Sequence, residues 1–91
     1  MPTISWFCGI AIRMFVVDHP PPHFHAVYGE FKAMVSIETG QVLEGQFPRR
    51  AAKLVEEWAL IHRSELLKNW ELASNGEHPD RIEGLDANRN S

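Results

Sequence analysis

The sequence lacks the features that mark a secreted, membrane-spanning or collagen-like protein. Its one cysteine, Cys8, cannot form an internal disulfide, which fits a reducing cytoplasm. No apolar run approaches the roughly 20 residues of a membrane helix, since the charge-free segment 4–12 is far too short. Residues 1–3 carry no basic segment of the kind that begins a secretory signal. We therefore expect a cytoplasmic protein with no membrane contact.

The chain is also short and carries little net charge. Its 91 residues suit one domain, and 44% hydrophobic and 23% charged residues are ordinary for a globular protein, which excludes a disordered chain. The formal net charge of −3 argues against a broad nucleic-acid binder and gives RNA no support as a partner. The end of the chain is polar, with Ile82 and Leu85 as its apolar anchors. We expect a single domain over residues 1–85 and a frayed tail over 86–91.

The first half of the chain has the alternation of β-strands. Apolar residues recur at every second position in segments 10–17 and 31–37, which is the period of a half-buried strand. Short links such as Gly29-Glu30 favour antiparallel neighbours, because a parallel return needs a much longer connection. The sequence thus predicts a meander of four to five strands, over residues 3–7, 10–17, 23–28, 31–38 and 41–45.

The second half changes to the period of an amphipathic helix. Pro48 suits a first helical position, and the chain from there to Ser74 contains no other proline and no glycine. One helix of that length would run about 39 Å, so the alternative is a break near Arg63-Ser64, where the serine can cap a second helix. The predicted fold class is α+β: a small antiparallel meander packed against one long or two consecutive C-terminal helices.

Two tryptophans lie on the predicted helical segment. Trp58 and Trp70 are twelve residues apart and therefore lie roughly on one face. Core packing is the simpler interpretation, but any bare part of this stripe would form a homodimer or bind a partner. We expect the core to join Phe31, Ala33, Val35 and Ile37 of the sheet to Leu54, Val55, Trp58 and Leu66 of the helix.

The segment 18–25, Asp-His-Pro-Pro-Pro-His-Phe-His, carries the residues with chemistry. On an extended chain, residues two apart point the same way, so His23 and His25 share a face and Phe24 points to the core. Two imidazoles so placed can bind one metal ion or flank one anion. The alternative is that they only close the polar end of the sheet through hydrogen bonds. The candidate ligands of a divalent ion such as zinc are His19, His23, His25 and Glu30, with Asp18 as an alternative third ligand.

Basic side chains gather at the predicted start of the helical segment. Arg49 and Arg50 lie where a helix N-terminus attracts anions, and with Arg13 they form a candidate anion-binding set. In a ribonuclease, His23 and His25 would act as general acid and base, while Arg49 would stabilise the transition state. The alternative is a solvated basic turn.

The Pro-His-Phe-His motif at residues 22–25 stands among further motifs, namely Gly9–Arg13, Tyr28-Gly29-Glu30, Pro48-Arg49-Arg50-Ala51 and Asn69-Trp70. Over residues 1 to about 85 this set resembles a small bacterial family, the uncharacterised domain numbered 4160 in the unknown-function series. Members of that family resemble the toxin-side component of two-gene, toxin–antitoxin-like modules. The resemblance therefore implies a toxin-like protein that acts through interaction with a small partner encoded nearby.

The sequence leaves three functions open, and it does not decide whether the protein is an enzyme. The first is the toxin-like component just described. The second is a metal-dependent hydrolase or ribonuclease that uses His19, His23 and His25. The third is a binding or structural domain without catalysis.

Overall fold

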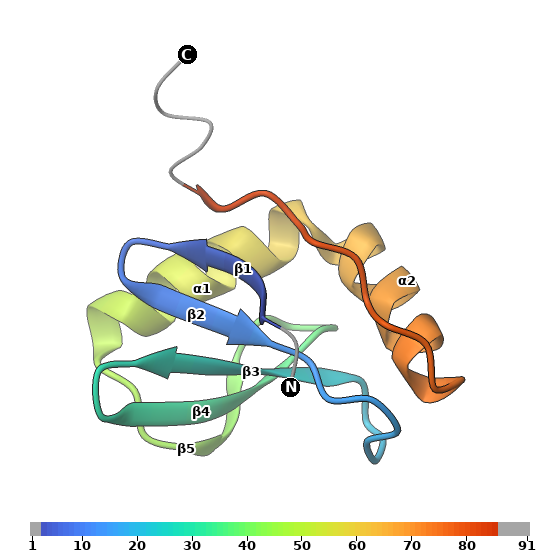
Figure 1. The fold of residues 1–91 in the computed structure, drawn as a ribbon. Coiled ribbons are helices and arrows are strands. Elements are labelled where there is room, and N and C mark those ends of the chain that lie inside the picture. The colour runs from blue at the N-terminus through green and yellow to red at the C-terminus, as the bar shows by residue number, and fades with distance from the viewer. Residues whose placement is uncertain (1–2, 86–91) are drawn as a thin grey trace.

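The computed structural model describes residues 3–85, which form a five-stranded antiparallel sheet and two consecutive helices (Figure 1). The strands follow one another across the sheet in chain order, so the α+β class and the meander are confirmed. The predicted frayed tail, 86–91, lies outside the described residues. The elements are β1 (Thr3–Phe7), β2 (Ile10–Arg13), β3 (His23–Tyr28), β4 (Phe31–Ser36), β5 (Val42–Gly45), α1 (Arg49–Ile61) and α2 (Arg63–Ser74).

Strand β2 is shorter than the predicted strand over residues 10–17, since its backbone pairing ends at Arg13. The alternation of side chains continues beyond that residue. Met14 is still buried, as its place in the pattern requires. Val17 then takes a left-handed backbone conformation (φ 58°), and its N–H donates to the carbonyl oxygen of Ala73 in α2 at 2.8 Å. The chain after Arg13 therefore turns away from the sheet and runs toward α2.

The helical segment divides at His62 into two helices, which decides between the two alternatives that the sequence left open. The peptide N–H of His62 still donates to Trp58 at 3.0 Å, but its backbone departs from helical geometry (φ −105°, ψ 25°). His62 rather than Ser64 is the cap of α2, so the predicted serine cap is wrong. In the described part of the chain, neither helix is long and apolar enough to cross a membrane.

Trp58 is the centre of the core. Its side chain is fully buried, with ring centroids 5.2 Å from Phe7 of β1 and 5.6 Å from Phe24 of β3. Its indole N–H donates to the carbonyl oxygen of Glu83 at 2.8 Å, so the segment after α2 is held against α1. The core interpretation of Trp58 is confirmed.

The predicted inward face of β4 is correct except at its first residue. Ala33, Val35 and Ile37 are buried, but Phe31 is 37% exposed. Phe31 pairs with Tyr28 directly beside the β3–β4 turn, at the end of the two strands. Leu54 packs against the core while remaining partly exposed.

Candidate metal centre

The first residues of β3 supply two of the three side chains in the candidate site. His23 and His25 lie on the same face of the strand, with ring centroids 5.2 Å apart. Phe24 between them is fully buried and contacts Trp58. The predicted orientation of these three residues is therefore confirmed.

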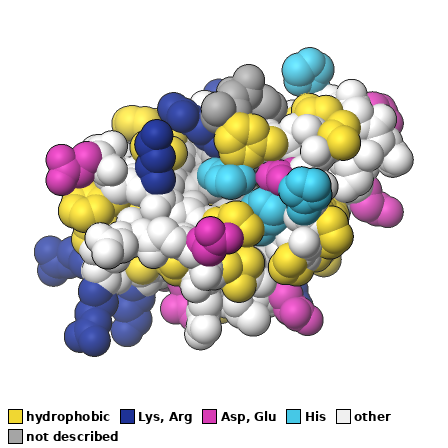
Figure 2. Space-filling view, turned by 90° about the horizontal axis from the view of Figure 1, so that it is seen from below, with side chains coloured by type: hydrophobic (Ala, Val, Ile, Leu, Met, Phe, Trp, Pro, Cys, Tyr) yellow, Lys and Arg dark blue, Asp and Glu magenta, His cyan; other side chains and the backbone are white. Residues whose placement is uncertain are grey.

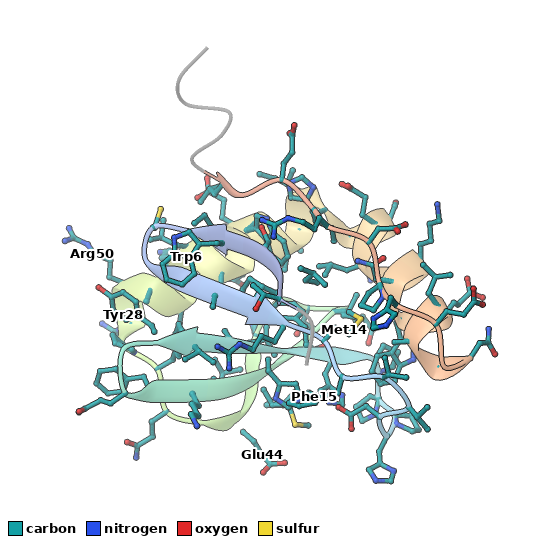
Figure 3. The ribbon with its side chains drawn as sticks, viewed as in Figure 1. Trp6, Met14, Phe15, Tyr28, Glu44 and Arg50 are labelled. Carbon is teal, nitrogen blue, oxygen red and sulfur yellow. The ribbon has the colours of Figure 1, made fainter. Side chains whose placement is uncertain are left out.

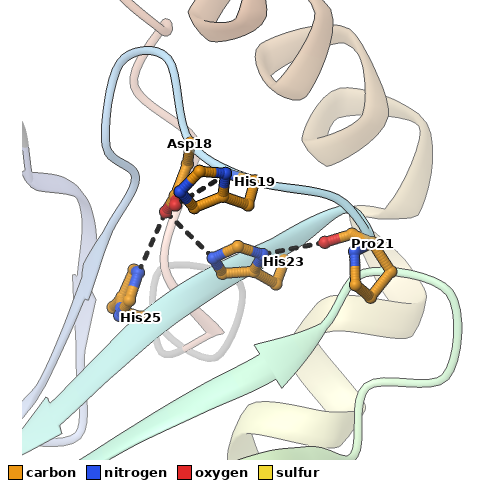
Figure 4. Close-up of polar contacts among 5 residues, drawn as sticks. All are labelled: Asp18, His19, Pro21, His23 and His25. Carbon is orange, nitrogen blue, oxygen red and sulfur yellow. Dashed lines mark hydrogen bonds and ion pairs between the residues drawn. The ribbon is translucent and has the colours of Figure 1, made fainter.

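The loop that connects β2 to β3 supplies the third side chain, Asp18. Its Oδ2 atom lies 2.9 Å from Nε2 of His23 and 3.4 Å from Nε2 of His25 (Figure 4). One potential ligand atom from each of the three residues lies within 4.8 Å of the other two. Asp18 and His25 keep 21% and 29% of their side-chain surface exposed, so solvent reaches the group.

A backbone carbonyl fixes the orientation of the His23 ring. Nδ1 of His23 lies 2.8 Å from the carbonyl oxygen of Pro21. A carbonyl oxygen only accepts hydrogen bonds, so Nδ1 must carry the proton and donate it. Neutral His23 then presents the lone pair of Nε2 to the carboxylate of Asp18. Two acceptors at 2.9 Å require a proton or a cation between them.

Aromatic side chains support both imidazole rings. The ring centroid of Trp70, from α2, lies 5.2 Å from that of His23, and the centroid of Phe15 lies 4.3 Å from that of His25 in an edge-on contact. Such packing limits the rotation of the rings and keeps them aimed at Asp18. The alternation in segment 10–17 places Phe15 on the same face as Arg13, so the sequence did indicate the side on which Phe15 lies. No local pattern indicates that α2 brings Trp70 to β3.

The pKa values of two members of the group are shifted. Partial burial raises the pKa of Asp18, but hydrogen bonds from the His19 peptide N–H and from His25, together with the electrostatic interaction with His23, outweigh it, and the pKa lies below its ordinary value. Burial lowers the pKa of His25 against the opposing hydrogen bond to Asp18 and the charge of that carboxylate, and a proton added to His23 would lower it further. Near neutral pH these shifts favour the carboxylate and the neutral imidazole, which are the forms that bind metal ions.

The other predicted ligands lie outside the group. His19 is exposed, and its peptide N–H donates to Oδ1 of Asp18 at 2.8 Å, so its backbone rather than its ring supports the site. Glu30 lies in the turn after β3, at the opposite end of that strand from His23. Within residues 3–85 the side chains whose potential ligand atoms converge are those of Asp18, His23 and His25, so Asp18 is the third candidate ligand.

The predicted anion-binding set is divided between two places. Arg13 pairs directly with His25 across β2 and β3. Arg49 and Arg50 lie at the start of α1, and Figure 3 shows Arg50 far from Phe15. The view from below likewise shows histidine side chains gathered around an acidic one, with many basic side chains toward the other end (Figure 2). The structure therefore places Arg13 beside His25, while Arg49 and Arg50 line a separate hollow on α1.

Comparison with known proteins gives one match. A family model described as a domain of unknown function, DUF4160, matches residues 9–71, which run from the turn before β2 into α2 and include the whole ligand group. No curated protein and no solved structure matches the chain.

Proposed function

The chain belongs to the DUF4160 family of unknown function, and we propose that it is a metal-dependent hydrolase whose divalent ion is bound by Asp18, His23 and His25. The observation that carries this proposal is the convergence of the three ligand atoms within 4.8 Å of one another at a partly exposed position. Two histidines and one carboxylate are a ligand set used by catalytic zinc sites, and three protein ligands leave room for water.

The alternative is a structural ion pair, in which a protonated His23 binds Asp18 and closes the end of the sheet. Nδ1 of His23 donates to Pro21, so this ion pair requires an added proton on Nε2 of His23, whereas a neutral His25 can donate from its own Nε2 to Asp18. A single divalent cation satisfies both nitrogens and the carboxylate at once. The carbonyl of Pro21 also holds Nδ1 of His23 in the way that outer hydrogen bonds usually orient a metal-binding histidine.

The proposed reaction class follows from the open position of the site. A divalent ion held by three protein ligands lowers the pKa of a bound water and provides a nucleophile at neutral pH. Phe15 and Trp70 flank the histidines and restrict the approach of further water. Zinc suits this nitrogen and oxygen set, and so do iron and manganese.

Calorimetric titration with zinc and manganese tests the metal centre directly. The protein is purified without a histidine tag and treated with a chelator beforehand. Binding at one site per chain is expected, with Asp18→Asn and His25→Ala each removing it, because two remaining ligands rarely hold a divalent ion. His19→Ala and His78→Ala are matched controls, since both rings lie outside the group, and both should bind as the wild type does. Binding that persists in both ligand variants would return the group to a structural role.

The second candidate is the toxin-like interaction role that the family resemblance implies. Exposed apolar side chains support it: Leu60, Ile61 and Leu67, at the junction of α1 and α2, are 53%, 56% and 43% exposed. The proposed homodimer would also use this surface, because Trp58 itself is buried. Growth inhibition on expression, relieved by the product of the neighbouring gene and lost in a Leu60→Ser, Ile61→Ser variant, would favour this role. A chain that stays monomeric and has no effect on growth would contradict it.

A further inference from the structure

The sheet face opposite the helices carries a hollow beside the metal centre. Its volume is about 300 Å³, at the lower end of the range for sites that bind small molecules. Figure 3 shows two of its residues, Phe15 and Glu44, on the side of the sheet away from the helices. The side chains that line it on this face are those of Arg13, Phe15, His25, Val27, Lys32, Met34 and Glu44.

Strand pairing determines which of these side chains are neighbours. His25 pairs with Arg13 of β2 on one side and with Met34 of β4 on the other, and Met34 pairs with Glu44 of β5. Directly paired residues of antiparallel strands point to the same face. One row therefore crosses four strands, with a cation at one end, a carboxylate at the other and the candidate metal ligand His25 between them.

The charges of the hollow favour an anionic ligand. Arg13 borders His25 directly, and Lys32 lies on the diagonal from it, in the next row of the same face. Within residues 3–85 neither cation forms an ion pair. Two unpaired cations beside one site attract a group with more than one acceptor oxygen, and arginine binds phosphate in a bidentate manner.

The remainder of the lining is apolar. Phe15 lies edge-on to His25, Met34 lies between His25 and Glu44 in the row, and Val27 pairs directly with Lys32. An aromatic ring and a thioether suit a flat, weakly polar group such as a base or an aromatic ring. Glu44 repels a second anionic group at its end of the row, and its carboxylate can accept a hydrogen bond from a hydroxyl or an amine.

We propose that this hollow is the substrate site of the metal centre, and that it binds an organic monophosphate of the size of a mononucleotide. The phosphate lies between Arg13 and Lys32, and the organic group lies against Phe15 and Met34. His25 belongs to both the hollow and the ligand group. That the bound monophosphate is a substrate rests on the proposed hydrolase. Binding of the ligand itself depends only on the residues of the hollow.

Titration of the full chain with three probes tests the assignment: adenosine 5′-monophosphate, adenosine and inorganic phosphate. The monophosphate should bind at least tenfold more tightly than either of the others, because only it uses both the cations and the apolar wall. Arg13→Gln and Lys32→Gln should each weaken its binding by about tenfold, the effect of losing one charge-assisted hydrogen bond. Arg81→Gln is the matched control, since Arg81 lies after α2 and outside the hollow.

The outcomes separate this inference from the proposed metal centre. Zinc binding that is intact, together with no preference for the monophosphate, overturns the ligand assignment alone. Equal affinities for inorganic phosphate and adenosine 5′-monophosphate also overturn it, because the apolar wall would then have no part in binding. Monophosphate binding that depends on Arg13 in a chain that binds no metal supports the site and contradicts the hydrolase. A melting temperature within the wild-type range confirms that each variant is folded.

Discussion

Nδ1 of His23 donates a hydrogen bond to the carbonyl oxygen of Pro21, two residues earlier in the chain, at 2.8 Å. This contact turns Nε2 of the same ring toward Asp18, which lies on the other side of the proline run. Three consecutive prolines restrict the backbone at this point, so less entropy is lost when the loop and the strand meet. The prolines thus help to hold the carboxylate of Asp18 in place over β3. A flexible loop in the same position would lose more entropy when a metal ion binds.

Phe24→Ala should be one of the most damaging single changes in this protein. Its ring is fully buried against Trp58, and removing a buried phenylalanine typically costs about 3–5 kcal/mol of the free energy of unfolding. Phe31→Ala is the matched control, because Phe31 is 37% exposed and should lose much less. Urea unfolding measures both. Equal losses would contradict the described burial of the two rings.

Neighbouring leucines in α2 offer a second matched pair. Leu66 is fully buried, whereas Leu67 is 43% exposed. Leu66→Ala should reduce the free energy of unfolding by about 2–5 kcal/mol, while surface changes such as Leu67→Ala usually stay within about 0.5 kcal/mol. If Leu67→Ala proved as costly as Leu66→Ala, either α2 would be rotated about its axis or Leu67 would be covered by another copy of the chain. The oligomeric state measured by light scattering distinguishes these two.

Gly45, at the end of β5, should not accept a side chain. Its backbone is left-handed (φ 91°), and a Cβ there would collide with the carbonyl oxygen of Lys32 in β4. Gly29 also has a positive φ (58°), but nothing lies near the position of its Cβ. Gly29→Ala should cost about 1–2 kcal/mol from backbone strain, and Gly45→Ala should cost more because the strands must also separate. Comparable melting temperatures for the two variants would contradict this difference.

Local patterns were sufficient to predict the strands and the helical face, but not where the loop residues lie. The period of two in segment 31–37 placed Ala33 and Val35 in the core, and the Gly29-Glu30 turn set the pairing of β3 with β4. Phe31, next to the turn, is the exception, because the period does not tell where the buried part of a strand ends. Segment 10–17 kept its alternation after pairing had stopped at Arg13. Periodicity indicates the direction in which side chains point, but it does not indicate where the backbone pairing of a strand ends.

The third ligand could not be chosen from the sequence for a related reason. Asp18, His19 and Glu30 all lie within a few residues of the two histidines along the chain or across a turn. The structure brings Asp18 to them after a turn at Val17, whose N–H bonds to Ala73, 56 positions later in the chain. Contacts between segments so distant in sequence leave no trace in local spacing. The same limitation applies to Arg50, which Figure 3 shows far from Phe15, the residue whose ring contacts His25.

Acid should destabilise the metal-free protein in two separate ranges of pH. The folded-state pKa of His25 lies below the ordinary value of 6.5, so the unfolded chain binds more protons as the pH falls through that value, and stability is lost there. The folded-state pKa of Asp18 lies below 3.8, so its contribution is present above that pH and is lost as the pH falls further. The shift of His25 therefore makes the protein more stable near pH 7.5 than near pH 5, and the shift of Asp18 adds a further loss below about pH 4.

Two substitutions assign these ranges to their residues, with urea unfolding measured in the presence of a chelator. His25→Gln should flatten the change in stability between pH 7.5 and pH 5, because the group responsible for it is gone. Asp18→Asn should reduce the loss below pH 4 but keep the loss near pH 6.5, since removing the hydrogen bond that raises the pKa of His25 lowers that pKa further. His78→Gln, outside the ligand group, should follow the wild-type curve. A His25→Gln variant that keeps the full loss between pH 7.5 and pH 5 would show that another group titrates there and would contradict the assignment of this range to His25.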